Sequence, residues 1–390
     1  MSNFYLCLVF AGFFAVASSV PALKITPGNT DFAFKFYHQI ALGAADNIFF
    51  SPLSISTVFA LLLLGARSTT RSQLLSGLSL NQINEQEIHR DFHLLLQFLN
   101  RPNAEIELNI GNAVFTHDQL KVLNTFLSHA KKNYQAEVFP VNFKKPAEAE
   151  QQINSYIENK TQGKLIDVVK DLDEDIVMVL VNYIFMKAYW ANPFNRDNTK
   201  DADFFVDEQT TVKVPTMNKD GLFKTYHDQG LSCVVVQLPY KGSASALFIL
   251  PDPGKLKQVE DALGRDVFSK WVTSLKQQRI NLFVPRLTMT SKYDVRDVLR
   301  RLGVIELFTN QADLSGITGT PELRVSKAIH QAYLNVHENG TEAAAVTVVD
   351  ISPTSLPPEV KLNRPFFFII FEEIIKTILF LGKVINPSKA

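Results

Sequence analysis

Side chains that could perform covalent chemistry are few in this chain and lie far apart. The 390 residues contain eight histidines and two cysteines. They contain no G-x-S-x-G, H-E-x-x-H, C-x-x-C or phosphate-loop motif, the sequences typical of many hydrolases, zinc enzymes, redox proteins and nucleotide-binding proteins. His89 and His93 have an i, i+4 spacing but no clear third ligand, so we interpret them as a surface pair. We predict no enzyme activity, no cofactor and no metal.

The cysteines predict a protein without an intrachain disulfide. Cys7 lies in the apolar stretch 4–17, which has the length and composition of a secretory signal. We therefore expect residues 1–19 to be a signal peptide with an approximate cleavage site, and the protein to be secreted and extracellular. Cys233 is then alone in the mature chain, and its apolar neighbours predict a buried small hydrophobic residue rather than a reactive thiol.

Composition limits the classes of partner. Lys+Arg and Asp+Glu each number 39, so the formal net charge is zero and no strong basic field would attract nucleic acid or an anionic membrane. Apolar residues make up 46% of the chain, which is ample for a large core. Without a repeat or a low-complexity linker, residues 20–390 are expected to form a single domain, and we expect a monomer.

Hydrophobic periodicity predicts the elements that must position any functional residue. Thr30 or Asp31 is expected to cap the first helix, and Pro52 to begin the second. Helices early in the chain and strands later indicate an α+β domain. We expect helices at 30–40, 52–64, 85–99, 122–134, 147–161 and 255–275, a central strand at 176–188, alternating strands from 204 onward and C-terminal strands at 366–371 and 377–383.

The segment 336–360, VHENGTEAAAVTVVDISPTSLPPEV, could serve as a strand or as a loop. Its first part is rich in small and β-branched residues, which enter a β-sheet with little steric penalty. Pro353, Pro357 and Pro358 cannot occupy a central strand, because proline lacks a backbone N–H. The segment is thus a potential strand tethered at both ends. The alternative is an ordinary loop beside an edge strand.

Five long motifs occur in order: NIFFSPLSIS at 47–56, LVNYIFMKAYWANPF at 180–194, ADLSGIT at 312–318, SKAIHQAYL at 326–334 and ILFLGKVINP at 378–387. Together with ENGTEAAA at 338–345, they resemble the serpin superfamily, and within it the secreted group that contains α1-antitrypsin and thyroxine-binding globulin. The resemblance covers nearly the whole mature chain. It implies a serpin fold of the α+β class, with three β-sheets, about eight or nine helices and an exposed reactive-centre loop.

The resemblance implies a suicide-type inhibitor of a serine protease. In inhibitory serpins the protease cleaves the exposed loop, which inserts as a new strand into the large sheet and carries the acylated protease with it. By this resemblance the reactive bond lies between Thr354 and Ser355, and Thr354 suits an elastase-like protease better than a trypsin-like or chymotrypsin-like one. The residues that match the loop hinge are Glu338, Gly340, Thr341, Ala343, Ala344 and Ala345.

Two further regions of the family match single residues of this chain. Ser51, Ser54, Asn182 and His330 match the shutter, where polar groups hydrogen-bond beneath the strands that open, and Trp190 matches the breach tryptophan. The alternative interpretation of these residues is ordinary hydrogen bonding of buried polar groups.

A second functional hypothesis is a non-inhibitory plasma carrier of a small hydrophobic ligand, like the hormone-binding serpins. Ser269, Val272 and Glu373 do not reproduce the thyroxine carrier's polar contacts, which argues against thyroxine itself. Glu373 beside apolar walls would suit a cationic or hydrogen-bonding ligand. The apolar pair Ile374 and Ile375 lies in a turn, which indicates either a pocket or a locally covered turn. The residues that match the carriers' pocket are Phe36, Ser269, Val272, Leu275, Glu373, Ile374, Ile375 and Lys376.

Two N-x-T sequons predict a glycoprotein. Asn159 lies at the end of an expected surface helix, and Asn339 lies inside the hinge. A glycan on Asn339 is expected to hinder loop insertion.

Overall fold

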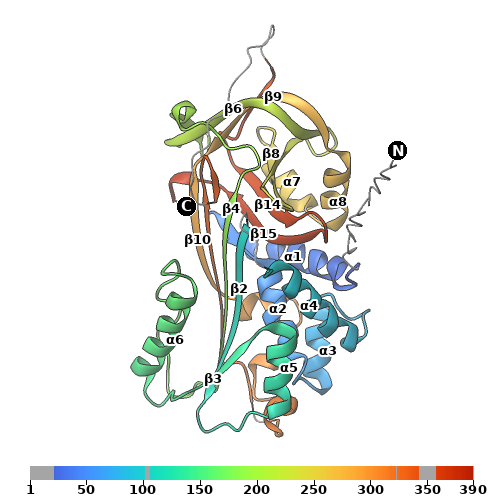
Figure 1. Ribbon diagram of the computed structural model, residues 1–390, viewed down its shortest axis with the longest axis vertical. Coiled ribbons are helices and arrows are strands. Elements are labelled where there is room, and N and C mark those ends of the chain that lie inside the picture. The colour runs from blue at the N-terminus through green and yellow to red at the C-terminus, as the bar shows by residue number, and fades with distance from the viewer. Residues whose placement is uncertain (1–21, 102–105, 322, 342–356, 390) are drawn as a thin grey trace, which may run out of the picture.

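The computed structural model describes residues 22–101, 106–321, 323–341 and 357–389. The expected signal segment 1–19, the hinge residues Ala343, Ala344 and Ala345, and the expected reactive bond between Thr354 and Ser355 lie outside these residues. The described chain forms two hydrogen-bonded β-sheets with helices packed around them (Figure 1).

Ten α-helices lie within the described residues. Their bounds are α1 (Ile25–Ala41), α2 (Pro52–Leu62), α3 (Ser68–Gly77), α4 (Glu85–Leu99), α5 (Asn124–Tyr134), α6 (Pro146–Lys160), α7 (Leu256–Ala262), α8 (Arg265–Ser274), α9 (Arg296–Arg301) and α10 (Ser315–Thr318). In Figure 1, α2 to α5 gather on one side of the lower half and α6 lies on the other side, while α7 and α8 lie beside the upper half.

The smaller sheet is built around a long central strand. Its order is β10 (Leu287–Asp294), β11 (Lys327–Val336), β4 (Met178–Tyr189), β2 (Ile106–His117) and β3 (Glu137–Val141), and the short β12 (Gly340–Thr341) also pairs with β4. β4 pairs antiparallel with β2 and parallel with β11. Leu180 and Ile184 belong to the main core, whereas Val179 and Val181 belong to a second core that includes residues of α6. Both faces are buried, so the strand is apolar almost throughout.

The larger sheet contains the remaining named strands. Its order is β1 (Ile48–Phe50), β15 (Thr377–Val384), β14 (Phe366–Glu372), β8 (Ala244–Pro251), β7 (Cys233–Pro239), β6 (Thr211–Asp228), β9 (Lys276–Pro285) and β13 (Glu359–Lys361), with β5 (Lys200–Phe205) paired to β6. The first six residues of β6 pair with β5, residues 216–225 pair with β9, and the last five residues pair with β7. The family resemblance implies three sheets. In the described residues β6 joins two groups of strands into one continuous sheet of nine, which leaves two hydrogen-bonded sheets.

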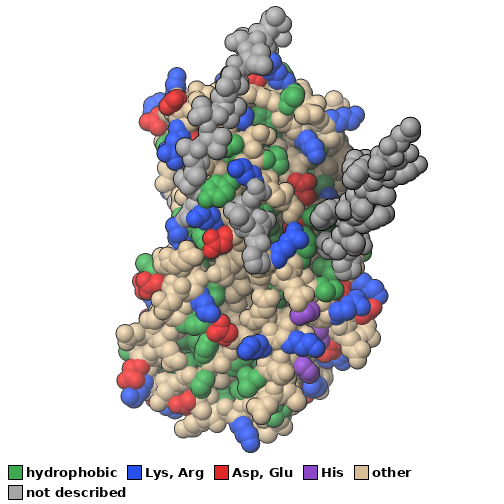
Figure 2. Space-filling view, viewed as in Figure 1, with side chains coloured by type: hydrophobic (Ala, Val, Ile, Leu, Met, Phe, Trp, Pro, Cys, Tyr) green, Lys and Arg blue, Asp and Glu red, His purple; other side chains and the backbone are tan. Residues whose placement is uncertain are grey.

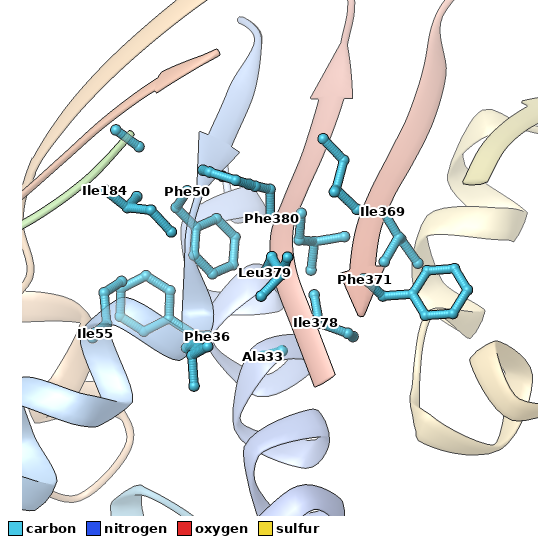
Figure 3. Close-up of a cluster of buried hydrophobic side chains, with 14 of the residues drawn as sticks. Ala33, Phe36, Phe50, Ile55, Ile184, Ile369, Phe371, Ile378, Leu379 and Phe380 are labelled. Atoms are coloured by element: carbon cyan, nitrogen blue, oxygen red, sulfur yellow. The ribbon is translucent and has the colours of Figure 1, made fainter. Parts of the chain in front are cut away.

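The main core lies where the helices meet both sheets. Phe36 from α1 and Phe50 from β1 lie with their ring centroids 5.1 Å apart, and Phe49 stacks on Phe380 of β15 at 5.4 Å. Figure 3 shows Ile55 of α2 and Ile184 of β4 on the same side of this cluster as Phe50, with β14 and β15 beyond. Aromatic side chains bury large apolar areas, so this cluster anchors helices α1 and α2 to both sheets.

Two sequence-based expectations are wrong in detail. Helix α1 begins at Ile25, so Thr30 lies inside it and its hydroxyl donates to Thr26 O (3.0 Å) instead of capping the helix. The single helix expected at 255–275 is two helices, α7 and α8, because Leu263 and Gly264 adopt extended conformations between them. Glycine disfavours a helix interior by about 1 kcal/mol relative to alanine. Pro52 does begin α2, and Ser51 Oγ caps it by accepting from Ser54 N (3.2 Å).

Candidate functional site

The site centres on the place along β4 where its partner strand changes from β11 to the short strand β12. The two strands form seven consecutive parallel pairs, from Lys327 with Val179 to Tyr333 with Phe185. Above Phe185 the partner of β4 changes: Tyr189 pairs antiparallel with Gly340, and Ala188 with Thr341. On its other edge, Ala188 pairs with β2. The hinge therefore enters the sheet on the β11 side of β4, as the start of an antiparallel strand.

Gly340 makes this entry possible. Its φ is +125°, a conformation that side chains with a Cβ rarely adopt. A Cβ at this position would lie 2.6 Å from Trp190 N and still closer to the carbonyl oxygen of Ala188. His337 and Gly340 exchange two backbone hydrogen bonds of 3.0 Å, which closes a tight turn just before the hinge reaches β4.

Trp190, the predicted breach tryptophan, holds this turn from the top of β4. Its backbone N–H donates to Asn339 O (2.8 Å), and its indole Nε1–H donates to His337 O (2.9 Å). The indole stacks on Tyr240, with the ring centroids 4.2 Å apart. One rigid side chain thus connects the end of the central strand, the hinge turn and the larger sheet.

Glu338 fixes the same turn by an ion pair in which its own carboxylate is buried and its partner Arg286 is partly exposed. Its Oε1 accepts from Arg286 Nε (2.7 Å) and from Thr199 Oγ1 (2.6 Å), and its carbonyl oxygen accepts from Phe194 N (2.8 Å). Burial opposes ionisation of this carboxyl, but the hydrogen bonds from Arg286 and Thr199 outweigh the burial and lower its pKa. The carboxylate is therefore charged at neutral pH, and its charge is balanced inside the protein.

The four residues predicted to form the shutter lie together. Asn182 belongs to β4 and His330 to β11, and Ser51 and Ser54 lie at the start of α2. Asn182 Oδ1 accepts from Ser54 Oγ and from His330 Nδ1, both at 2.7 Å. Asn182 Nδ2 donates to Asn112 Oδ1 (2.8 Å), and Ser51 N donates to His330 Nε2 (3.0 Å). Asn112, Asn182 and His330 are neighbours across three adjacent strands. The network links β2, β4 and β11 to α2.

The hydrogen bonds assign the protonation state of His330. Nε2 accepts from a backbone N–H, so the proton of the neutral ring lies on Nδ1, where it is donated to Asn182. Burial lowers the pKa of His330 to about 3. The ring is therefore neutral over the whole physiological pH range, and protonation would place two donors against each other at Ser51.

The residues matched to the carriers' pocket differ in how far they are exposed. Phe36 is buried in the core, whereas Ser269 and Lys376 are exposed. Ile374 is 54% exposed at the β14–β15 turn, but Ile375 is buried and its N–H donates to Glu372 Oε2 (2.7 Å). Val272 and Leu275 are partly buried at the edge of the core.

Glu373 lines a hollow of about 440 Å³ together with Trp190. Its carboxylate accepts from Ser245 Oγ (2.5 Å) and Gln237 Nε2 (3.2 Å). Leu238 supplies part of the apolar wall of this hollow. The carboxylate is thus held by neutral donors.

Sequence reasoning missed three residues that complete the site: Asn112, Arg286 and Thr199. Asn112 lies in strand β2, a stretch for which no element was predicted, although a polar residue within an apolar stretch could have indicated it. Arg286 and Thr199 lie 52 and 139 residues from Glu338, and no local pattern in the sequence connects them to the hinge.

The remaining candidates for chemistry are held by ordinary contacts. His89 Nδ1 bonds Tyr134 Oη (2.5 Å) and His93 Nδ1 bonds Lys132 O (2.8 Å), so the pair faces different partners. In the part of the chain that the structure describes, no group of three or more His, Cys, Asp or Glu could hold a metal. Cys233 is buried, and burial raises the pKa of its thiol to about 12.

The visible surface carries charged side chains of both signs. On the face shown in Figure 2, basic and acidic side chains are interspersed. Among the helices described, none is long and apolar enough to span a membrane.

The two sequon asparagines differ in exposure. Asn159 lies exposed at the end of α6, whereas Asn339 is only 3% exposed.

Comparisons with known proteins identify the family. Residues 27–387 match the family model described as serpin (serine protease inhibitor). The chain is 47% identical over 369 residues to alpha-1-antiproteinase from Rattus norvegicus, covering 94% of this chain and 90% of the relative. Human thyroxine-binding globulin superposes with a TM-score of 0.90 at 39% identity, and human glycosylated kallistatin with 0.88 at 42%; each covers 94% of this chain and 99% of the other. The chain belongs to the serpin family.

Proposed function

We propose that this protein is a secreted inhibitor of serine proteases that acts by cleavage and insertion of its reactive-centre loop. The observation that carries the proposal is the antiparallel pairing of Gly340 and Thr341 with β4, at the end of the sheet where β4 and β11 are not yet paired. A strand that enters between two parallel strands and runs antiparallel to both is the arrangement that loop insertion requires. The relatives named alpha-1-antiproteinase support the same activity.

The observed pairing defines the register of insertion. Gly340 lies opposite Tyr189 and Thr341 opposite Ala188, so each later loop residue would pair one residue lower on β4. In this register Thr347 comes opposite Asn182 of the shutter. Insertion must separate the seven β4–β11 pairs and the bond between His330 and Asn182. In exchange, both strands gain antiparallel partners, which are slightly more stable per residue than parallel ones.

The target class follows from the residue before the reactive bond. Thr354 is small and uncharged, so we propose a protease with an elastase-like pocket. A trypsin-like pocket selects Arg or Lys through a buried carboxylate, and a chymotrypsin-like pocket is shaped for large apolar side chains.

The test is complex formation. We expect an SDS-resistant complex after incubation with pancreatic elastase. Trypsin and chymotrypsin should form no complex, because residues 340–360 contain no Lys, Arg or aromatic residue. Thr341→Arg should convert the protein to a substrate, because a charged side chain would have to enter the sheet, whereas Thr341→Ser should retain inhibition. Cleavage by elastase without any complex, and without a rise in the melting temperature of the cleaved protein, would refute the proposal.

The alternative is transport of a small hydrophobic ligand, which the fold similarity to thyroxine-binding globulin and the exposed side chain of Ile374 favour. Binding of a panel of apolar cations, followed by tryptophan fluorescence, tests this alternative. Affinity that falls at least tenfold in Ile374→Asn would support a carrier, and unchanged affinity would exclude the turn as its site.

A further inference from the structure

The amide nitrogen of Asn339 is buried and makes no hydrogen bond to any described residue. Asn339 begins the sequon Asn339-Gly340-Thr341, and its Nδ2 is the atom to which an N-linked sugar is attached. The residue is 3% exposed. The side chain that the sequon marks for modification is therefore closed to solvent when the hinge lies in the sheet.

The backbone of Asn339 is held in place by hydrogen bonds on both sides of its buried side chain. Its carbonyl oxygen accepts from Trp190 N (2.8 Å), and its N–H donates to His337 Nδ1 (3.3 Å). The next residue, Gly340, lies against the backbone of β4 and pairs with Tyr189. A glycan needs an open path from Nδ2 to solvent, so the glycosylated residue would have to give up these contacts.

The sequon is accessible for a period during synthesis, because residues that complete the core follow it in the chain. Strands β14 and β15 follow Asn339 in the sequence and supply Phe371 and Phe380 to the main core. The fold is therefore incomplete when the sequon emerges during synthesis in a secretory compartment. A glycan can be attached then, before the hinge pairs with β4.

We infer that Asn339 is a glycosylation site used before folding is complete, and that its glycan keeps the hinge out of the sheet. The protein then exists in two forms. The form without this glycan has the hinge paired with β4, and the glycosylated form has the hinge outside. This inference rests on the proposed function only where it assigns inhibition to the first form and substrate behaviour to the second.

The experiment uses full-length protein secreted from mammalian cells. Peptide mass spectrometry after enzymatic deglycosylation in ¹⁸O-water measures occupancy at Asn339, with the exposed Asn159 as the internal reference site. Chromatography separates the two forms, and mass spectrometry of the peptide that contains Asn339 identifies which fraction carries the glycan. Hydrogen exchange then reports the backbone amides of Trp190 and Gly340, which the paired hinge protects.

We expect partial occupancy at Asn339 and exchange at Trp190 at least tenfold faster in the glycosylated form. Asn339→Gln and Thr341→Ala each remove the sequon and should give only the protected form, whereas Thr341→Ser keeps the sequon and should give both. Asn159→Gln should change neither result. Zero occupancy at Asn339, or equal protection of Trp190 in both forms, would overturn the inference.

A protease assay on the separated forms adds the functional arm. Only the form without the Asn339 glycan should yield the SDS-resistant complex. If neither form yields it but the exchange difference is present, the glycan inference stands and the proposed inhibitory function fails.

Discussion

Replacement of Glu338 by alanine tests whether the ion pair with Arg286 stabilises the end of the smaller sheet where the hinge joins β4. The side chain of Glu338 is 2% exposed, and Arg286 and Thr199 both donate to its carboxylate. The remaining partner, Arg286, has a side chain that is 42% exposed, so water can solvate its charge and no unpaired buried charge is left. The loss is then that of the hydrogen bonds to the carboxylate, which are worth about 1.5–3 kcal/mol each when one group is charged. Because Arg286 and Thr199 both lose their acceptor, we expect a loss of about 3 kcal/mol.

The unfolding entropy of about 2.1 cal/mol/K per residue gives roughly 0.8 kcal/mol/K for a domain of this size, so this loss lowers the melting temperature by about 4 °C. Calorimetry at pH 7 measures the shift. Glu338→Gln keeps an oxygen that can accept from Thr199 and should show a smaller loss. Glu359 pairs with Lys361 at the surface, and Glu359→Ala is the matched control, with an expected effect of about 0–1 kcal/mol.

The pH dependence provides a second check on the same residue. The folded-state pKa of Glu338 is lowered, so its contribution to stability is fully present above the pKa of the unfolded carboxyl and is lost as the pH falls through the folded pKa. The difference between parent and Glu338→Ala should be full at pH 7 and should shrink in acid. If Glu338→Ala melts within 1 °C of Glu359→Ala at pH 7, the ion pair does not stabilise the hinge as argued.

Three further predictions follow from the site. The pKa of His330 is lowered to about 3, so as the pH falls the unfolded chain binds this proton before the folded protein does. The free energy of unfolding should therefore fall by up to about 1.4 kcal/mol per pH unit below pH 6.5. Denaturant titrations should show that the stability of His330→Gln depends less on pH. Gly340→Ala should expel the hinge, and amide exchange at Trp190 should accelerate at least tenfold, whereas Gly163→Ala at an open turn should leave it unchanged. Burial raises the pKa of Cys233 to about 12, so a thiol reagent should label the native protein no faster than it unfolds; rapid labelling at pH 7 would contradict the burial.

Local patterns in the sequence predict the elements around the site well. Helix α4 occupies the predicted residues 85–99, and Ser51 with Pro52 begins α2 as their cap and N1 preferences imply. The division between α7 and α8 was not predicted, because the apolar residues of both helices continue one periodic pattern across Gly264. A single glycine gives only a weak signal, which packing can override.

Contacts between distant strands could not be predicted from such patterns. The bond between Asn182 and Asn112 depends on the register of β2 against β4, and the Arg286–Glu338 pair depends on the end of β9 lying beside the hinge turn. A one-residue change of register would turn Asn112 to the opposite face of the sheet. The family resemblance supplied Asn182 and His330 with their partners Ser54 and Ser51, but the partner Asn112 required the fold.

The register at the hinge also explains the composition of the loop that follows it. Strand residues that pair directly share a face of the sheet, and on β4 the side chains of Met186, Ile184 and Leu180 belong to the main core. Continuing the pairing of Gly340 with Tyr189 and Thr341 with Ala188 sets Ala343, Ala345, Thr347, Val349 and Ile351 opposite Met186, Ile184, Asn182, Leu180 and Met178.

The inward-facing positions are therefore small or apolar, with one exception. Thr347 would lie opposite Asn182, whose Oδ1 accepts from His330 while the strands are closed. When β11 moves away, the hydroxyl of Thr347 can donate to that same oxygen, so the buried amide keeps a partner on both sides of the transition. Glu342 and Asp350 fall on the alternate positions, where they would lie opposite Lys187 and Val179. Val179 belongs to the second core, which includes residues of α6, so insertion in this register would place the charge of Asp350 against a buried apolar position. The segment from Thr341 to Val349 thus meets the needs of a central strand in the register that the hinge has begun.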